Sequence, residues 1–338
     1  MSGGAEGVYV EQPGDLRDVR RFAHEAMATV YEVYAVHADR QYAAQAAHAC
    51  FDLVDRLERE LSRFLPNSDV ARINDLTAGD STRVAPSTLE CLVIARHIFE
   101  LTGGAFDVSI GTGMPSLEFD TEESVVRATA EGVRIDLGGI GKGYAVDLMA
   151  ELLEDWGLTA ALVHGGFSSV LALDPPGTAD GWPLTLSDPR EPSTVLERLS
   201  VRQTALGASG VRKRDHIVDP HTGTPVCGRR AAWVTVPRPR ATVAQGERQY
   251  RAAAAAVTDA LTTACMLLGR NEIDALCRNS PGVEAWILED TELLHFGVAA
   301  RELSERASGA ERASGAERAG EAASEPRCRG VRGAKPLG

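Results

Sequence analysis

Residues 135–147 carry the most informative stretch of this chain, Ile-Asp-Leu-Gly-Gly-Ile-Gly-Lys-Gly-Tyr-Ala-Val-Asp. An apolar run enters the stretch, four glycines lie within residues 138–143, and a helical pattern extends from Gly143 to Trp156. Glycine lets the backbone turn tightly and approach a ligand closely. A helix N-terminus adds free N–H groups and a partial positive charge. The stretch therefore predicts a turn that binds phosphate or pyrophosphate, with Lys142 adding a full charge; a purely structural turn is the alternative.

The composition limits what such a turn can bind. With 338 residues, 44% hydrophobic and 25% charged, the chain has the make-up of a globular protein. Its formal net charge of -13 repels polyphosphate, so we expect no nucleic-acid partner. A nucleotide would need a local positive site, which a metal ion, a helix N-terminus or a few cations can supply. The glycine spacing matches neither the dinucleotide-binding fingerprint nor the P-loop.

Cysteine usage and the N-terminus indicate the compartment. The six cysteines are scattered without a Cys-x-x-Cys pair, which favours buried, reduced thiols over disulfides or metal ligands. Residues 1–15 lack the basic start and the apolar run of a secretory signal. No stretch approaches the ~18 apolar residues that a membrane span needs. We therefore expect a cytoplasmic protein without membrane insertion.

The chain divides into an arm, one domain and a tail. Residues 1–22 are expected to form a flexible arm and residues 23–303 the domain. Residues 304–338 repeat charged, Ala, Ser and Gly residues without apolar anchors, which predicts a disordered tail. Periodicity predicts helices over 43–64, 86–102, 143–156 and 251–268, and strands over 27–36, 160–164, 170–173, 184–187, 231–236, 285–289 and 292–296. Their irregular order favours an α+β fold over a doubly wound sheet.

Four motifs in order resemble those of the FAD:protein FMN transferases, the ApbE-like flavin transferases. They are the glycine-rich stretch, Gly-Gly-Ala-Phe-Asp at 103–107, His-Ile-Val-Asp-Pro-His-Thr-Gly-Thr-Pro at 216–225, and Asp-Ala-Leu-Thr-Thr-Ala at 259–264. Residues 61–64 and 72–74 are weaker echoes of the family's N-terminal part. The resemblance extends from about Met27 to Phe296. It implies mixed sheets in a barrel-like core flanked by helices, related to the T-fold.

The resemblance also implies a reaction. The FMN moiety of FAD would be transferred, with Mg²⁺, to a Thr or Ser hydroxyl of an acceptor flavoprotein, and AMP would be released. Two other functions remain open: an FAD pyrophosphatase, in which water attacks the same phosphorus, and a non-catalytic protein that only binds flavin.

The metal residues follow from spacing and from the family. Asp259 and Thr263 stand four residues apart on a predicted helix, so both side chains lie on one face. A carboxylate and a hydroxyl are hard oxygen ligands that suit Mg²⁺. The alternative is an aspartate near a helix end and a threonine bonded to the preceding turn. The resemblance adds the backbone carbonyl of Gly139 as a third ligand.

The resemblance assigns the remaining FAD contacts. Two groups of residues would line the nucleotide: Ala105, Phe106 and Asp107 on the adenine side, and Asp136 and Lys142 along its length. Met27 and Phe64 would pack near the flavin, and Ile217 and Val218 belong to the same cofactor-binding set. The alternatives are core positions for Met27 and Phe64 and a turn cap for Asp107.

His216 is the candidate general base for the incoming hydroxyl, because an imidazole titrates near about pH 6.5. Asp219 would orient it or hold the loop through Thr222. A structural loop histidine is the alternative. The sequence departs from the family pattern at Phe167, which follows the turn at 165–166, where a polar Asp or Asn is usual.

Overall fold

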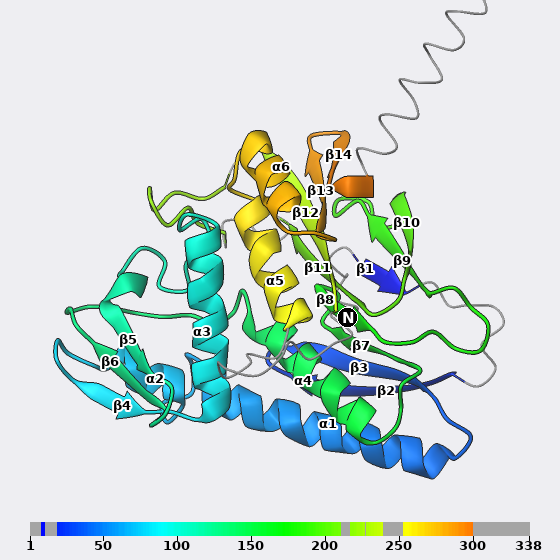
Figure 1. The fold of residues 1–338 in the computed structure, drawn as a ribbon, viewed down its shortest axis with the longest axis horizontal. Helices are drawn as coiled ribbons and strands as arrows, with labels where there is room; N and C mark the ends of the chain where they lie inside the picture. Colours follow the sequence, from blue (N-terminus) through cyan, green and yellow to red (C-terminus); the bar gives the residue numbers. More distant parts are fainter. Residues whose placement is uncertain (1–7, 11–18, 211–216, 227, 239–252, 300–338) are drawn as a thin grey trace, which may run out of the picture.

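The protein is described here by a computed structural model over residues 8–10, 19–210, 217–226, 228–238 and 253–299. Its centre is an eight-stranded sheet in the order β14-β13-β12-β11-β8-β7-β3-β2 (Figure 1). Every pair of neighbours in this sheet is antiparallel. In chain order its strands are β2 (Val19–Ala26), β3 (Thr29–Val36), β7 (Ala161–Gly165), β8 (Ser169–Ala172), β11 (Thr204–Gly210), β12 (Arg229–Pro237), β13 (Glu284–Glu289) and β14 (Glu292–Phe296).

The two faces of this sheet support two different cores, because side chains alternate along a strand. On β7, Val163 belongs to the core shared with the helices, whereas Leu162 belongs to a second core. The second core holds Trp182 and Leu184 of a smaller sheet, β1-β9-β10. Its strands are β1 (Val8–Val10), β9 (Trp182–Ser187) and β10 (Val195–Val201). The body of the protein is thus three layers: helices, large sheet, small sheet.

The helical layer brings together the motifs predicted from sequence. Its members are α1 (Arg40–Leu61), α3 (Pro86–Leu101), α4 (Gly141–Asp155), α5 (Ala254–Cys265) and α6 (Arg270–Asn279). Helices α4 and α5 pack against each other and against the large sheet, and α1 lies along α4 and β2 (Figure 1). Helix α1 begins where the Asp39 carboxylate accepts the N–H groups of Gln41 and Tyr42.

A third sheet, β4-β6-β5, lies beside α2 and α3 at the left of Figure 1. Its strands are β4 (Ser81–Arg83), β5 (Leu117–Asp120) and β6 (Val125–Ala128), with α2 (Asp69–Asn74) and the short 3-10 helix η1 (Met114–Ser116) nearby in the chain. The α+β class is confirmed, and the large sheet is open, since β14 and β2 form its two edges.

Two differences from the expected elements have clear causes. Strand β2 begins at Val19, inside the segment expected to be the flexible arm, because it pairs with β3 along its full length. Strand β11 was not expected, since its sequence Thr-Ala-Leu-Gly-Ala-Ser-Gly has few β-branched residues. A Cβ on Gly207 would lie 2.7 Å from the backbone of Thr258. The small residues of β11 therefore allow α5 to approach closely.

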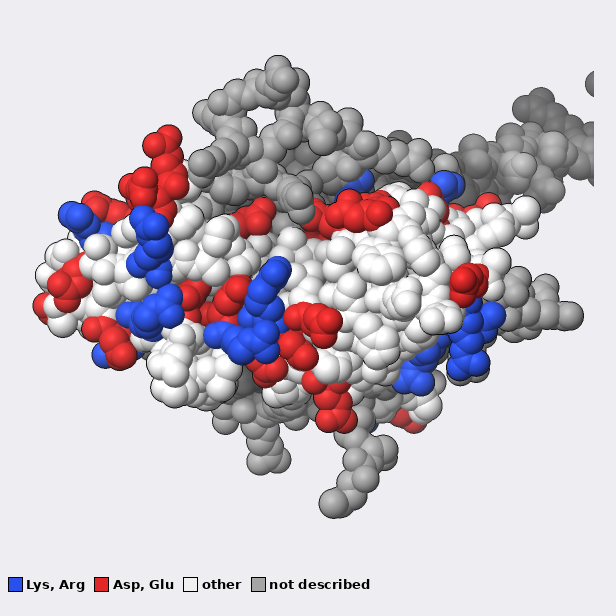
Figure 2. Space-filling view, turned by 90° about the horizontal axis from the view of Figure 1, so that it is seen from below, with Lys and Arg blue, Asp and Glu red and all other residues white. Residues whose placement is uncertain are grey.

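The length of the helices and the charges on the surface can be compared with the predictions of no membrane span and an acidic surface. Among the described residues, no helix has the length and apolarity to cross a bilayer. On the face that carries α1, acidic and basic side chains are interspersed from the left end to the centre of the view, and a mostly uncharged area separates them from further basic and acidic side chains at the right (Figure 2).

Candidate functional site

The glycine-rich turn is fixed by residues far away in the sequence. Asn74 exchanges two hydrogen bonds with the backbone of Ile135, through Nδ2 at 3.0 Å and Oδ1 at 2.7 Å. The Asp136 carboxylate accepts the N–H of Gly138 at 2.9 Å and pairs with Arg63 at 3.2 Å. Asp136, predicted to lie along a nucleotide, is thus an internal brace of the turn. The guanidinium that pairs with it follows the end of α1 by two residues.

The turn delivers the N-terminus of α4 to Asp259 of α5. Asp259 is buried, and its Oδ2 accepts the backbone N–H of Gly143 at 3.1 Å. The Lys142 ammonium lies 3.4 Å from the same oxygen and donates to the carbonyl of Gly138 at 3.0 Å. Ile140, at the N-cap of α4, has no side chain that could cap the helix, and Asp259 accepts a first-turn N–H in its place. An anion at this place is stabilised by the helix dipole and by Lys142 together.

The three predicted metal residues gather here. A Cβ on Gly139 would lie 3.6 Å from Oγ1 of Thr263 and 3.3 Å from the ring of Phe106. Thr263 also donates weakly, at 3.4 Å, to the carbonyl of Asp259 one turn earlier. Among the hydrogen bonds of the described residues, none uses Oδ1 of Asp259. That oxygen and the Thr263 hydroxyl are therefore available as ligands.

The donor set fits a small, hard cation. No group of three or more His, Cys, Asp or Glu residues that could hold a metal occurs in the described part of the chain. Among the three predicted metal residues, Asp259 would supply the one charge, beside a hydroxyl and a backbone carbonyl. Mg²⁺ accepts such sets because it keeps waters and substrate phosphate oxygens in its other positions. A zinc or iron site, which needs more nitrogen, sulfur or carboxylate ligands, does not fit.

The Gly-Gly-Ala-Phe-Asp segment forms one wall. The Phe106 N–H is accepted by the Thr102 hydroxyl at 3.1 Å, and its buried ring lies against Gly139. The Asp107 carboxylate accepts the N–H and the hydroxyl of Ser109 and the N–H of Gly111 at 2.7–2.9 Å. Asp107 therefore caps its own turn, as the structural alternative expected, and Phe106 is the residue of this motif that faces the candidate metal site.

The loop at 217–226 packs against this wall. The Asp219 carboxylate accepts the N–H of His221 at 2.8 Å and the hydroxyl of Thr222 at 3.0 Å. These hydrogen bonds, led by the one from His221, hold the pKa of Asp219 below its ordinary value. The His221 ring lies 3.2 Å from where a Cβ on Gly104 would stand. Asp219 thus organises the loop, while His216, the predicted base, lies outside the described residues.

Three predicted cofactor contacts have structural roles in the described loops. Ala105 and Ile217 are buried and belong to the main hydrophobic core. Val218 forms an isolated bridge with Pro225, which closes the loop. These residues shape the surroundings of the site.

The two residues predicted near the flavin differ in environment. Met27 sits in the β2–β3 turn with a positive φ of 49°, and its sulfur accepts the Tyr31 hydroxyl at 3.1 Å. Burial, and secondarily the charge of Asp259, raises the pKa of Tyr31. Tyr31 therefore lies between the Met27 turn and the Asp259 carboxylate. Phe64 is 80% exposed with the Arg63 guanidinium 4.7 Å above its ring, so Phe64 is not a core residue.

Sequence reasoning missed the contact that joins α4 to α5. The buried Asp147 carboxylate accepts the N–H groups of Ala255 at 2.9 Å and Ala256 at 2.8 Å. Asp147 stands at the end of the quoted glycine-rich stretch without an assigned role. A signal was present: it is a carboxylate between apolar residues on a predicted helix, four residues after Gly143. Buried carboxylates of this kind need specific partners.

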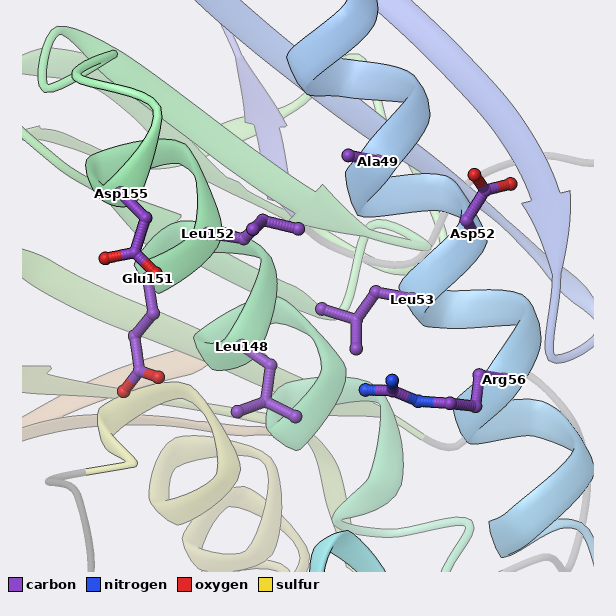
Figure 3. Close-up of a pocket in the computed structure, with 8 residues that line it drawn as sticks. All are labelled: Ala49, Asp52, Leu53, Arg56, Leu148, Glu151, Leu152 and Asp155. Carbon is purple, nitrogen blue, oxygen red and sulfur yellow. The ribbon is translucent and has the colours of Figure 1, made fainter.

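An open groove between α1 and α4 lies apart from this site (Figure 3). Its volume is about 400 Å³, and none of the predicted site residues lines it. It is lined by Ala49, Asp52, Leu53, Arg56, Leu148, Glu151, Leu152 and Asp155.

Comparison with known proteins places these features in context. The family model described as the ApbE family matches residues 27–287. An FAD:protein FMN transferase of Treponema pallidum is 28% identical over 293 residues, covering 71% of this chain and 76% of the relative. One of Vibrio cholerae is 25% identical over 222 residues, covering 54% and 66%.

Solved structures show the same fold. The ApbE protein of Thermotoga maritima superposes with a TM-score of 0.70 at 22% identity, covering 82% of this chain and 97% of that one. The apo flavinyl transferase ApbE of Pseudomonas stutzeri has a TM-score of 0.69 at 21% identity, covering 84% and 96%.

Proposed function

The chain belongs to the ApbE family, and we propose that it is an enzyme that transfers the FMN moiety of FAD to a Thr or Ser hydroxyl of an acceptor flavoprotein. Relatives named FAD:protein FMN transferase support the activity. One observation carries the proposal for this chain: the buried carboxylate of Asp259 meets the first turn of α4, beside Lys142 and Thr263. This arrangement suits a pyrophosphate bound together with a divalent cation.

In this proposal, residues of α4 bind the pyrophosphate, and residues of α5 and of the glycine-rich turn bind the cation. The positive end of the α4 dipole and the Lys142 ammonium attract the pyrophosphate oxygens. Asp259, Thr263 and the carbonyl of Gly139 would hold the cation, for which Mg²⁺ is the proposed identity. When bound, the cation supplies charge neutralisation on the phosphate oxygens during transfer. Phe106 closes this end of the site and keeps water out.

The proposed reaction balances as a displacement at phosphorus. A bond forms between the acceptor hydroxyl oxygen and the phosphorus of the FMN half. The bond from that phosphorus to the bridging oxygen breaks, and AMP leaves with this oxygen. The hydroxyl proton goes to a base, for which His216 is the candidate. Asp219 supports the proposal indirectly, because it holds the loop that follows His216 against the Gly104 wall.

The test is a reaction of the purified full chain with FAD, Mg²⁺ and an acceptor flavoprotein domain that carries a flavin-attachment Thr or Ser. We expect fluorescent flavin that stays on the acceptor after denaturing electrophoresis, with one AMP released per flavin attached. Free FMN and AMP in equal amounts, without labelled acceptor, would instead identify a pyrophosphatase. Bound but unconsumed FAD would identify a flavin carrier.

A further inference from the structure

Helices α4 and α5 touch backbone to backbone where the candidate site begins. A Cβ on Gly143 would lie 2.1 Å from the carbonyl oxygen of Ala255 and 2.9 Å from Cα of Ala256. No real Cβ makes contacts this short, so Gly143 is the residue that permits the approach. The same residue donates its N–H to Asp259.

Asp147 lies four residues after Gly143, on the same face of α4. Its two carboxylate oxygens each accept one N–H of α5, from Ala255 and from Ala256. These are first-turn N–H groups, which have no partner inside their own helix. Helix α5 has no side-chain cap of its own at Ala253. Asp147 therefore serves as the cap of α5, supplied by a neighbouring helix.

We propose that Asp147 is a positioning residue for the metal-binding carboxylate of Asp259. Asp259 follows Ala255 by four residues, about one helical turn, so it lies on the same side of α5 as the capped N–H groups. Fixing the first turn of α5 on α4 fixes the distance from Asp259 to the N–H of Gly143 and to Lys142. This inference rests on the proposed function, since it assigns a purpose to Asp259.

A purely stabilising role explains less. Burial raises the pKa of Asp147 to about 8, against the opposing effect of its two backbone hydrogen bonds. A buried carboxyl group thus costs free energy that an apolar side chain of similar size would avoid. What the carboxyl group adds is a pair of directed acceptors, and these set the relative position of two helices. A ligand-orienting residue of this type affects metal affinity by about 10- to 100-fold when replaced.

The test compares Asp147→Asn with Asp155→Asn in the full chain. In Asp147→Asn one acceptor oxygen becomes an NH₂ group, which cannot accept an N–H. Asp155→Asn makes the same chemical change at the exposed end of α4 and serves as the control. The readout is FAD fluorescence anisotropy as Mg²⁺ is titrated above pH 8, where Asp147 is ionised. It needs no acceptor and no turnover. We expect the half-saturating Mg²⁺ concentration to rise at least about 10-fold in Asp147→Asn and to stay at the wild-type value in the control.

An unchanged half-saturating Mg²⁺ concentration in Asp147→Asn, with or without a lower melting temperature, would overturn the positioning role. Should this variant fail to fold, Asp147→Ser offers a smaller side chain that keeps one acceptor oxygen, and the same result is expected of it. A wild-type protein that binds FAD with Mg²⁺ yet labels no acceptor would contradict the proposed function alone. The positioning test would still be read from the same titration.

Discussion

Gly143→Ala is the sharpest perturbation of the contact between α4 and α5. The added Cβ would stand 2.1 Å from the Ala255 oxygen and 2.6 Å from its carbonyl carbon, both of them backbone atoms. Rotation of a side chain cannot relieve this overlap, so α5 must move. Gly141→Ala is the matched control for stability, because its Cβ would lie 3.8 Å from Leu61 and 4.0 Å from Leu137, which are ordinary contacts.

The expected magnitude follows from three contributions. Overpacking against backbone costs about 3 kcal/mol, the upper part of the usual range. Loss of the N–H bond from Gly143 to the Asp259 carboxylate costs about 1.5 kcal/mol. Alanine in place of glycine in a helix returns about 1 kcal/mol. The net loss is about 3.5 kcal/mol, or roughly 7–14 °C in melting temperature for a domain of this size.

The assay is differential scanning calorimetry of wild type and both variants, without FAD or metal, in one buffer. Gly143→Ala should melt roughly 7–14 °C below wild type. Gly141→Ala should melt at or slightly above the wild-type temperature. If Gly143→Ala and Gly141→Ala melt at the same temperature, α4 and α5 do not approach each other as closely as the structure shows. The proposed placement of Asp259 at the first turn of α4 would then also be wrong.

Three further predictions concern the site itself. Asp259→Ala should abolish FAD turnover while the protein stays folded, since the charged ligand of the proposed metal site is lost; Mg²⁺-dependent turnover at the wild-type rate would remove the metal assignment. His216→Ala should slow flavin transfer while FAD still binds, as measured by anisotropy, and a normal rate would exclude it as the base. The buried carboxyl of Asp147 keeps its proton to about pH 8, well above its ordinary value, so its contribution to stability should be full below about pH 4 and fall as the pH rises to 8. The melting temperature of wild type should therefore decline relative to Asp147→Asn between pH 5 and 8, and parallel curves would contradict the raised pKa.

Helices and strands could be predicted where the pattern of apolar residues within the segment is strong. Helix α1 was expected over 43–64 and runs over Arg40–Leu61, and the closing hairpin was expected and observed at β13 and β14. The periodicity of apolar residues is strong in these segments. It is weak in β11, whose small residues are explained only by the approach of α5. Strand β2 was missed in part because its burial comes from pairing with β3, a contact that sequence does not display.

The candidate site divides in the same way. From sequence alone, the glycine-rich stretch predicted a turn entering a helix, and the four-residue spacing of Asp259 and Thr263 predicted one shared face, because both are consequences of helical geometry. Only the tertiary structure brought Asp259 to the N-terminus of α4, 116 residues away in the chain. The tertiary structure also shows that the carboxylates of Asp136 and Asp107 accept N–H groups of their own turns and that Asp147 caps α5. These roles depend on which N–H groups a carboxylate meets across the fold, and only packing between helices decides that.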